Sequence, residues 1–256
     1  MYKRQPFERL VQKCRDHGVL SLVDGAHGIG HIPLDLTALD ADFFLSNLHK
    51  WFFVPRGCAL LYVPVRNQPL IRSSIPTSVA WKPRDVTGPF RFPSATTPYT
   101  DLFEFVGVAD SQNYLVVPAA QKFREELCGG EDMIRDYCFK LAREGGDKAA
   151  EILETEVMDH PQSHFRDCAL VNIRLPLEVG DEPGKVKPEH VRAVAGYLRY
   201  QSGVEYDTVL QVLPYKGQFW LRLSAQVYLE LSDFEYVAGV AKELCGKVRS
   251  GEFLNE

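Results

Sequence analysis

The chain has 256 residues, of which 45% are hydrophobic and 25% are charged, and these values are typical of a folded globular protein. The composition excludes a disordered or collagen-like chain, and no run of about 18 apolar residues predicts a transmembrane helix. The net charge is -5 and no dense basic cluster is present, so we expect neither nucleic acid nor a membrane as a partner.

The cysteines and the amino-terminal residues predict the compartment. No two cysteines form a CxxC pair, which argues against structural zinc and a dithiol redox site. They are Cys14, Cys58, Cys128, Cys138, Cys168 and Cys245. Such scattered cysteines favour a reduced, intracellular setting over a disulfide framework. Residues 1–18 are charged and amphipathic without the apolar core of a signal peptide, so we expect a cytoplasmic protein.

Helix and strand patterns alternate through roughly the first 65 residues. Apolar residues at helical spacing are followed by short apolar runs that end at turn signals. The expected elements are a helix over 7–14, a buried parallel strand over 19–23, a short helix and then a strand within 35–51, and a strand over 57–65. This alternation predicts an α/β layer architecture.

The second half of the chain follows a long irregular segment. Residues 67–104 are rich in Pro, Ser, Thr and aromatic residues, and a loop of this length is usually functional or mobile. A helical pattern resumes over 106–123, and Gly129 with Gly130 predicts a domain boundary. The elements expected beyond it are helices over 131–156, 188–203 and 232–248 and strands within 168–177 and 219–228. Ser232 and Glu235 predict a capping box for the last helix.

Two residues of the first half have the chemistry of a cofactor site. Asp24 follows an apolar strand, at the edge where α/β proteins bind ligands, although a turn or helix-capping aspartate is the commoner role. Lys50 follows the next strand between His49 and Trp51, an unusual setting for a solvated charge. Burial favours the free amine that Schiff-base chemistry requires. A lysine that carries pyridoxal phosphate and an acid that keeps its pyridine nitrogen protonated together form such a site.

Three segments carry a resemblance to a known family. VDGAHGIGHIPLDL, DADFFLSNLHKW and PRGCALLYV resemble, in order and spacing, motifs of the class V aminotransferase family of fold-type I pyridoxal-phosphate enzymes. The similarity continues through VPAAQKF and LRLSAQVY, in the branch that contains isopenicillin N epimerase-like proteins and hercynylcysteine sulfoxide lyases. It implies an α/β fold in which residues 1–128 are an incomplete pyridoxal-phosphate-binding large domain with a mostly parallel sheet. Residues 129–256 would be a smaller α/β domain. Family members usually begin well before the first helix of this chain, so we expect a large domain that is shortened at its amino terminus.

The resemblance also implies the cofactor-binding residues. Lys50 would be the Schiff-base lysine, and Asp24 the partner of the pyridine nitrogen. His27 would lie near the phenolic oxygen of the cofactor, its alternative role being a turn histidine bonded to the backbone. Asn47 and His49 would contact the phosphate or the surroundings of the lysine. The resemblance implies pyridoxal 5'-phosphate as the cofactor, no metal, and a homodimer.

The substrate side of the implied site combines one match and two departures. Arg222, otherwise an ordinary strand arginine, would bind the α-carboxylate of an amino-acid substrate with its planar guanidinium. Gly107 and Val108 stand where the family usually has a Gly-Thr pair, and valine cannot donate a hydrogen bond to the phosphate of a neighbouring subunit. Residues 201–210 lack the nucleophilic cysteine of a cysteine desulfurase, and Cys168 lies in an apolar strand as a core residue.

These residues leave several functions open. The first hypothesis is a pyridoxal-phosphate enzyme that cleaves a carbon–sulfur bond by β-elimination, with Lys50 as the base at the substrate Cα. An epimerase or aminotransferase of the same family would use the same residues, because the cofactor supplies the electron sink in each case. The alternative from another class is a non-catalytic or truncated paralogue, which the shortened large domain and Val108 favour.

Overall fold

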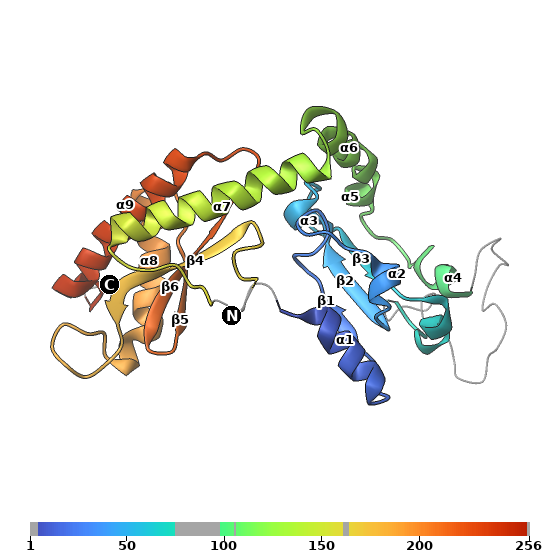
Figure 1. Ribbon diagram of the computed structural model, residues 1–256, viewed down its shortest axis with the longest axis horizontal. Helices are drawn as coiled ribbons and strands as arrows, with labels where there is room; N and C mark the ends of the chain where they lie inside the picture. The colour runs from blue at the N-terminus through green and yellow to red at the C-terminus, as the bar shows by residue number, and fades with distance from the viewer. Residues whose placement is uncertain (1–4, 75–97, 105, 161–163, 255–256) are drawn as a thin grey trace. The chain divides into compact units, whose positions relative to one another are not determined.

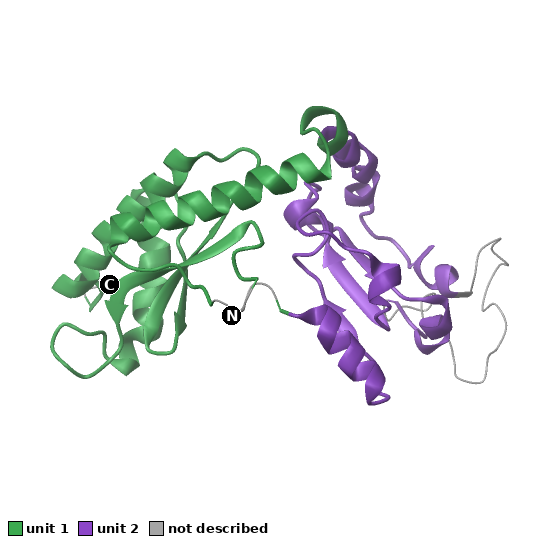
Figure 2. Ribbon diagram, in the orientation of Figure 1, with its two compact units in different colours: residues 1–5, 124–256 green, residues 6–123 purple. Residues whose placement is uncertain are grey.

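The chain folds into two compact units, each with its own three-stranded sheet (Figures 1 and 2). Unit 2 comprises residues 6–123, and unit 1 comprises residues 124–256 together with residues 1–5. The computed structural model describes residues 5–74, 98–104, 106–160 and 164–254. Most of the predicted loop at 67–104 therefore lies outside the described residues. The assignment of the two halves to a large and a small domain of a pyridoxal-phosphate enzyme stays a prediction.

Unit 2 alternates helix and strand, as its sequence pattern predicts. Its elements are α1 (Phe7–Asp16), β1 (Leu22–Asp24), α2 (Leu36–Leu39), β2 (Phe43–Asn47), α3 (Leu48–Trp51), β3 (Ala59–Tyr62), the 3-10 helix η1 (Val65–Leu70), α4 (Pro98–Glu104), α5 (Gln112–Leu115) and α6 (Val117–Lys122). In the sheet, of order β1-β2-β3, β1 runs parallel to β2 and β3 runs antiparallel to it. The carboxyl ends of β1 and β2 therefore lie at the same edge, and α3 begins there.

The helix predicted over 106–123 is interrupted. Gly107 has a φ of +101°, and only α5 and α6 in this stretch are helical. Pro118 lies in the first turn of α6, where its missing N–H and fixed φ start a helix but do not continue one from α5. The helical pattern expected over 106–123 therefore forms two short helices that begin only at Gln112.

β1 is an exposed edge strand. The parallel pairing predicted for this apolar run is confirmed by the register of Leu22 with Phe43. The predicted burial is wrong, because Val19, Leu20 and Leu22 expose 57%, 59% and 62% of their surface. Among the described residues β1 has β2 as its single neighbour, so its outer edge is uncovered.

A small apolar cluster fixes α3. It contains the buried side chains of Leu48, Val54, Cys58 and Ala120, with Ile29, Phe52 and Val117 packed against it. Burying one such aliphatic side chain fully contributes about 1.5–3 kcal/mol. The cluster joins the start of α3 to the residue before β3 and to α6, so the short helix that carries Lys50 has a defined position within unit 2.

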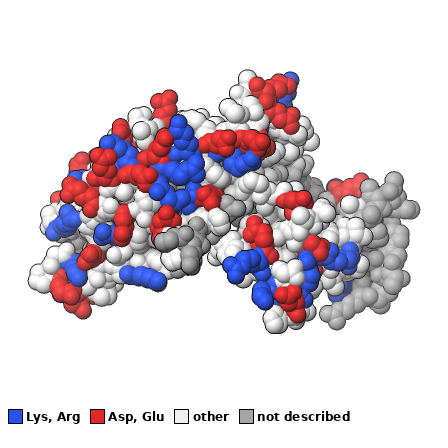
Figure 3. All heavy atoms as spheres, in the orientation of Figure 1, with Lys and Arg blue, Asp and Glu red and all other residues white. Residues whose placement is uncertain are grey.

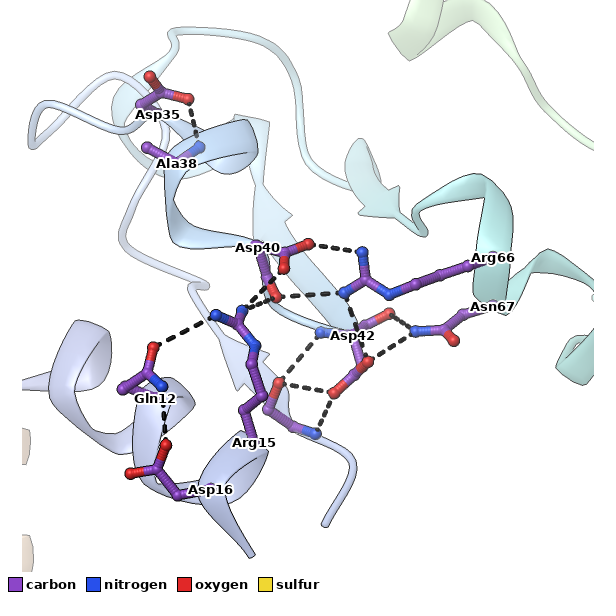
Figure 4. A network of polar contacts seen from close by, with 10 residues as sticks. Gln12, Arg15, Asp16, Asp35, Ala38, Asp40, Asp42, Arg66 and Asn67 are labelled. Carbon is purple, nitrogen blue, oxygen red and sulfur yellow. Dashed lines mark hydrogen bonds and ion pairs between the residues drawn. The ribbon is translucent and has the colours of Figure 1, made fainter. Parts of the chain in front are cut away.

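A polar network holds the starts of β1 and β2 together (Figure 4). Asp42 Oδ2 accepts hydrogen bonds from the backbone N and the Oγ of Ser21, at 2.9 and 3.1 Å. Asp42 Oδ1 accepts a hydrogen bond from Asn67 Nδ2 at 2.8 Å and lies 3.5 Å from Arg66 Nη2. Partial burial by itself raises the pKa of Asp42, but these hydrogen bonds and the charge of Arg66 hold it below its ordinary value.

Unit 1 consists of three long helices and an antiparallel sheet of order β4-β6-β5. After η2 (Phe123–Leu127), a π-helical turn that begins in unit 2, its elements are α7 (Glu131–Leu153), β4 (Leu170–Glu178), η3 (Pro188–His190), α8 (Val191–Glu205), β5 (Gln211–Tyr215), β6 (Gln218–Ser224), α9 (Leu231–Ser250) and η4 (Glu252–Leu254). The predicted helices and strands of this half are confirmed, and β5 is an additional strand. Lys216 and Gly217 join β5 to β6 with φ of +49° and +73°, as a type I′ hairpin turn requires.

Two glycines allow α7 to approach its neighbours closely. Gly145 and Gly146 lie inside the helix, where a glycine costs about 1 kcal/mol relative to alanine. A Cβ at Gly146 would lie 2.6 Å from Val171 Cγ2 in β4, and one at Gly145 would lie 2.4 Å from Phe234 Cδ1 in α9. Gly146 therefore brings the helix against the sheet, and Gly145 brings it against α9.

The capping box of α9 lies two residues before the predicted one. The N-cap is Glu230, and its backbone N donates to Asp233 Oδ2 at 2.8 Å in a reciprocal capping box. Ser232 is already inside the helix, so its prediction as N-cap is wrong. Glu230 has the extended backbone of a cap residue, which the hydroxyl-based pattern did not anticipate.

No helix among the described residues is long and apolar enough to cross a bilayer. On the face shown in Figure 3, basic and acidic side chains are interspersed. Within the described ranges, no group of His, Cys, Asp and Glu side chains forms a metal site.

We expect Asp42→Asn to lower the free energy of unfolding by about 1–3 kcal/mol at neutral pH, because an amide cannot accept every hydrogen bond that the carboxylate accepts. The pKa of Asp42 is lowered in the folded protein, so its contribution exists above the unfolded-state pKa and is lost as pH falls through the folded-state pKa. The difference between variant and wild type should therefore shrink towards acid pH in urea unfolding curves.

The matched control is Asp40→Asn in the same network. The Asp40 side chain is 41% exposed and pairs with Arg66 at 2.5 Å and with Arg15 at 2.9 Å. Exposed ion pairs contribute about 0–1 kcal/mol, so its loss should be smaller. Equal losses for both variants at all pH values would refute the role given to Asp42.

Candidate active site

The turn after β1 is built on glycine. Asp24 Oδ1 accepts a hydrogen bond from Ala26 N at 3.0 Å, which closes an Asx-turn. Gly25 N donates to Leu45 O at 2.8 Å, and a Cβ at Gly25 would lie 2.4 Å from Phe44 Cζ. Only glycine leaves room for the Phe44 ring, so residues 24–31 lie tightly over β2.

Asp24 keeps one oxygen available. The residue is exposed, and its Oδ2 has no hydrogen-bond partner among the described residues. No ion pair joins Asp24 to Lys50 in the parts of the chain that the structure describes. The Asx-turn confirms the role of turn aspartate that the sequence indicates as the commoner one. The Oδ2 of Asp24 is still available for a hydrogen bond to a ligand.

His27 lies between Lys50 and Trp51. Its Nε2 is 3.2 Å from Lys50 Nζ, and its Nδ1 accepts a hydrogen bond from Trp51 Nε1 at 3.0 Å. Lys50 and Trp51 are neighbours in α3, at the carboxyl end of β2, whereas His27 follows β1. The structure therefore brings together two of the predicted site residues, Lys50 and His27, through the edge that the parallel strands share.

His31 completes this group and was not predicted from the sequence. Its ring stacks on Trp51 with centroids 4.1 Å apart and an angle of 16°, and its Nδ1 donates to His27 O at 2.9 Å. His31 is 7% exposed and Trp51 is 5% exposed. The sequence signal was the position of His31 one helical turn after His27, within the motif HGIGH.

Asn47 and His49 flank Lys50 in sequence but differ in their contacts. Asn47 is the half-buried N-cap of α3, and its side chain makes no hydrogen bond within the described residues. His49 Nδ1 donates to Cys58 O at 3.1 Å, which ties α3 to the residue before β3. The Nε2 of His49 remains on the other side of the ring.

Arg222 belongs to β6 in unit 1. It pairs with Asn172 in β4 and Gln211 in β5, and these side chains share one face because cross-strand partners point the same way. Burial lowers the pKa of the Arg222 guanidinium. Arg222 Nε, Asn172 Oδ1 and Trp220 Nε1 are buried without a hydrogen-bond partner among the described residues. Buried polar atoms are nearly always hydrogen-bonded in native proteins, so this face fits a polar ligand or water.

The structure also shows where the residues lie that depart from the family pattern. Cys168 is 2% exposed with its Sγ 3.2 Å from Leu170 O, which confirms it as a core residue. Val108 is fully exposed in the segment before α5. Residues 201–210 form the end of α8 and the turn before β5, without a cysteine.

The turn at residues 24–31 and α3 both lie in a part of the chain that is similar to a known family. A family model described as "Aminotransferase class-V" matches residues 3–75, which contain both. The chain resembles the class V aminotransferase family, as its motifs predict. This family comprises pyridoxal-phosphate enzymes.

Curated relatives cover nearly the whole chain. The L-cysteine desulfhydrase-like protein lolT1 of Epichloe uncinata is 39% identical over 97% of this chain and 60% of its own length. The hercynylcysteine sulfoxide lyase of Schizosaccharomyces pombe is 32% identical over 94% of this chain and 55% of its own length. The isopenicillin N epimerase of Streptomyces clavuligerus is 28% identical over 94% of this chain and 57% of its own length. The chain thus spans 60% or less of these relatives.

A solved structure shows the fold. The apo cysteine desulfurase from Thermococcus onnurineus NA1 superposes with a TM-score of 0.64 at 20% identity, over 94% of this chain and 56% of that one. The predicted α/β fold, which is the fold-type I architecture, is therefore confirmed.

Gly30→Ala should destabilise the turn strongly. Gly30 has a φ of +75°, and a Cβ there would lie 2.7 Å from Trp51 O, a backbone atom that cannot move freely. Overpacking of this kind costs about 1–3 kcal/mol in the free energy of unfolding, beyond the backbone strain of a left-handed alanine.

Gly18→Ala is the matched control for this measurement. Gly18 has a φ of +65° with open space where the Cβ would lie, so the variant carries the backbone strain alone. Urea unfolding of both variants isolates the steric effect, and equal losses would show that Gly30 does not support Trp51.

Proposed function

We propose that the chain is part of a pyridoxal-phosphate-dependent lyase that cleaves a carbon–sulfur bond of an amino-acid substrate by β-elimination. The contact of Lys50 Nζ with His27 Nε2 at 3.2 Å carries this proposal, because it puts an amine and an imidazole together within the family motifs. The relatives named as a desulfhydrase-like protein and a sulfoxide lyase support carbon–sulfur cleavage.

The side chains of unit 2 fit the cofactor. Within the described residues, Lys50 contacts an imidazole and no carboxylate, so its amine is not held in an ion pair. Lys50 would hold pyridoxal 5'-phosphate through Nζ, and the available Oδ2 of Asp24 would accept a hydrogen bond from the pyridine nitrogen. Asn47 and the Nε2 of His49 would contact the phosphate of the cofactor or the surroundings of the lysine. The bound cofactor supplies an electron sink for the carbanion at the substrate Cα.

The remaining chemistry belongs to protein side chains. The Lys50 amine would take the proton from the substrate Cα, and His27 would keep Nζ in position through the observed contact. Arg222 would bind the substrate carboxylate, because its Nε is buried without a hydrogen-bond partner among the described residues. Loss of the Cβ substituent then releases a sulfur-containing fragment. We also propose a homodimer, as is common among enzymes of this family.

Pyridoxal phosphate and borohydride test the cofactor assignment. Borohydride fixes the cofactor irreversibly on the lysine that holds it, so peptide mass spectrometry should find the added mass at Lys50. Lys50→Ala should lose the adduct and keep the far-ultraviolet circular dichroism of the wild type. Lys13→Ala, which removes a lysine whose side chain is 73% exposed, should keep the adduct. An adduct elsewhere, or none, refutes the assignment. Pyruvate release from cysteine and cysteine S-conjugates would distinguish β-elimination from epimerisation or transamination.

Arg222→Gln should weaken substrate binding without lowering the stability of the protein. We expect KM for the amino-acid substrate to rise about tenfold or more, because one charge-assisted carboxylate contact is lost. The melting temperature should not fall, since the variant removes a buried cation whose Nε has no partner in the described part of the chain.

Arg174→Gln is the control for this pair of measurements. Its Nε forms an ion pair with Glu156 Oε1 at 3.1 Å, so it should lose a little stability and keep its KM. An unchanged KM in Arg222→Gln would remove Arg222 from the site.

A further inference from the structure

We infer that Trp51 is a positioning residue that fixes the proton of His27 on Nε2 and thereby favours the uncharged amine of Lys50. The inference deepens the proposed function, because an uncharged amine is the form in which a lysine attacks a carbonyl. It rests on two hydrogen bonds and one ring contact that join the turn to α3, and on one hydrogen bond within the turn.

The first step concerns Nδ1 of His27. Trp51 Nε1 lies 3.0 Å from this nitrogen. An indole nitrogen carries one hydrogen and has no lone pair to offer, so it can only donate. Nδ1 must therefore accept and carry no proton. Both the imidazolium and the neutral tautomer with a proton on Nδ1 would place two N–H groups against each other.

The second step concerns the opposite ring nitrogen. A neutral imidazole without a proton on Nδ1 has its proton on Nε2, and this nitrogen lies 3.2 Å from Lys50 Nζ. An ammonium group has three donors and no acceptor, so a charged Lys50 would face the Nε2 proton without a lone pair. The contact is a hydrogen bond only when Lys50 is an amine that accepts from His27.

Burial and ring stacking hold the Trp51 indole in place. The Trp51 ring is 5% exposed and stacks on His31 at 4.1 Å. His31 Nδ1 in turn donates to the backbone O of His27 at 2.9 Å. Rotation of the indole away from His27 would break the stacking and leave a polar N–H in a buried position, which is unfavourable. The tautomer is therefore set by packing before any cofactor binds.

Lys50 and Trp51 are adjacent in α3, and this adjacency couples their side chains through His27. Neighbouring residues of one short helix contact the two opposite nitrogens of a single imidazole. The state of one nitrogen determines the state of the other, so the indole acts on the amine through the ring. Trp51 touches neither a reacting atom nor Lys50 Nζ in this scheme, which distinguishes it from a catalytic residue.

The test measures the tautomer directly, on the full chain without cofactor. Long-range proton–nitrogen NMR spectra of protein with nitrogen-15 histidine distinguish a protonated Nε2 from a protonated Nδ1, and His27→Gln assigns the signals. We expect wild-type His27 to be protonated on Nε2 alone at neutral pH. In Trp51→Phe, which keeps an aromatic ring for His31 but lacks the N–H, the preference should be lost. Trp220→Phe removes an indole N–H in unit 1 and should leave His27 unchanged.

The reactivity of the amine provides a second readout. Acetic anhydride at trace concentration modifies uncharged amines, and mass spectrometry gives the labelling rate of Lys50 relative to Lys13. This ratio should fall about fivefold in Trp51→Phe, the change expected for one hydrogen bond of ordinary strength. Unchanged labelling together with an unchanged tautomer would overturn the inference.

The wild-type spectrum tests the inference even if Trp51→Phe does not fold. A proton on Nδ1, or on both nitrogens, in the wild-type chain at neutral pH refutes it outright. Failure of the proposed function would look different, because a missing borohydride adduct at Lys50 leaves the tautomer of His27 as it is.

Discussion

The imidazole of His27 is the point on which the candidate site depends, because each of its nitrogens contacts a different residue of α3. His27 occupies this position because the turn that carries it lies directly on β2. Gly25 allows the approach by leaving room for Phe44, and Gly30 allows it by leaving room for the Trp51 carbonyl. The arrangement of amine, imidazole and indole is thus a consequence of backbone packing at two glycines.

Sequence patterns predicted the elements of this site better than its contacts. The alternation of strand and helix was sufficient to place Asp24 and Lys50 near one edge of a parallel pair, and the family resemblance added His27. The pairing of His31 with Trp51 could not be predicted, because ring stacking depends on side-chain directions that spacing alone does not define. The role of Asp24 in an Asx-turn was weighed correctly as the commoner one, and its role towards a cofactor stays a prediction.

The errors in the fold have physical causes of the same kind. The apolar run at 19–23 predicted burial, but a strand is buried only where another layer or strand covers it. Ser232 matched the pattern of a cap, whereas the backbone of Glu230 turns into the helix two residues earlier. β5 contains Pro214, a residue that argues against a strand, and is held by its hairpin with β6.

The reciprocal hydrogen bonds of Ser21 and Asp42 lie where β1 and β2 begin, and they define which residues of the two strands face each other. Side chains of a strand alternate between its faces, so a slip of one residue would turn Phe44 to the opposite side of the sheet. Gly25 would then have no ring above it, and the turn would lose its support. Strand register, set by a serine and an aspartate outside the candidate site, is thus what keeps His27 within reach of Lys50.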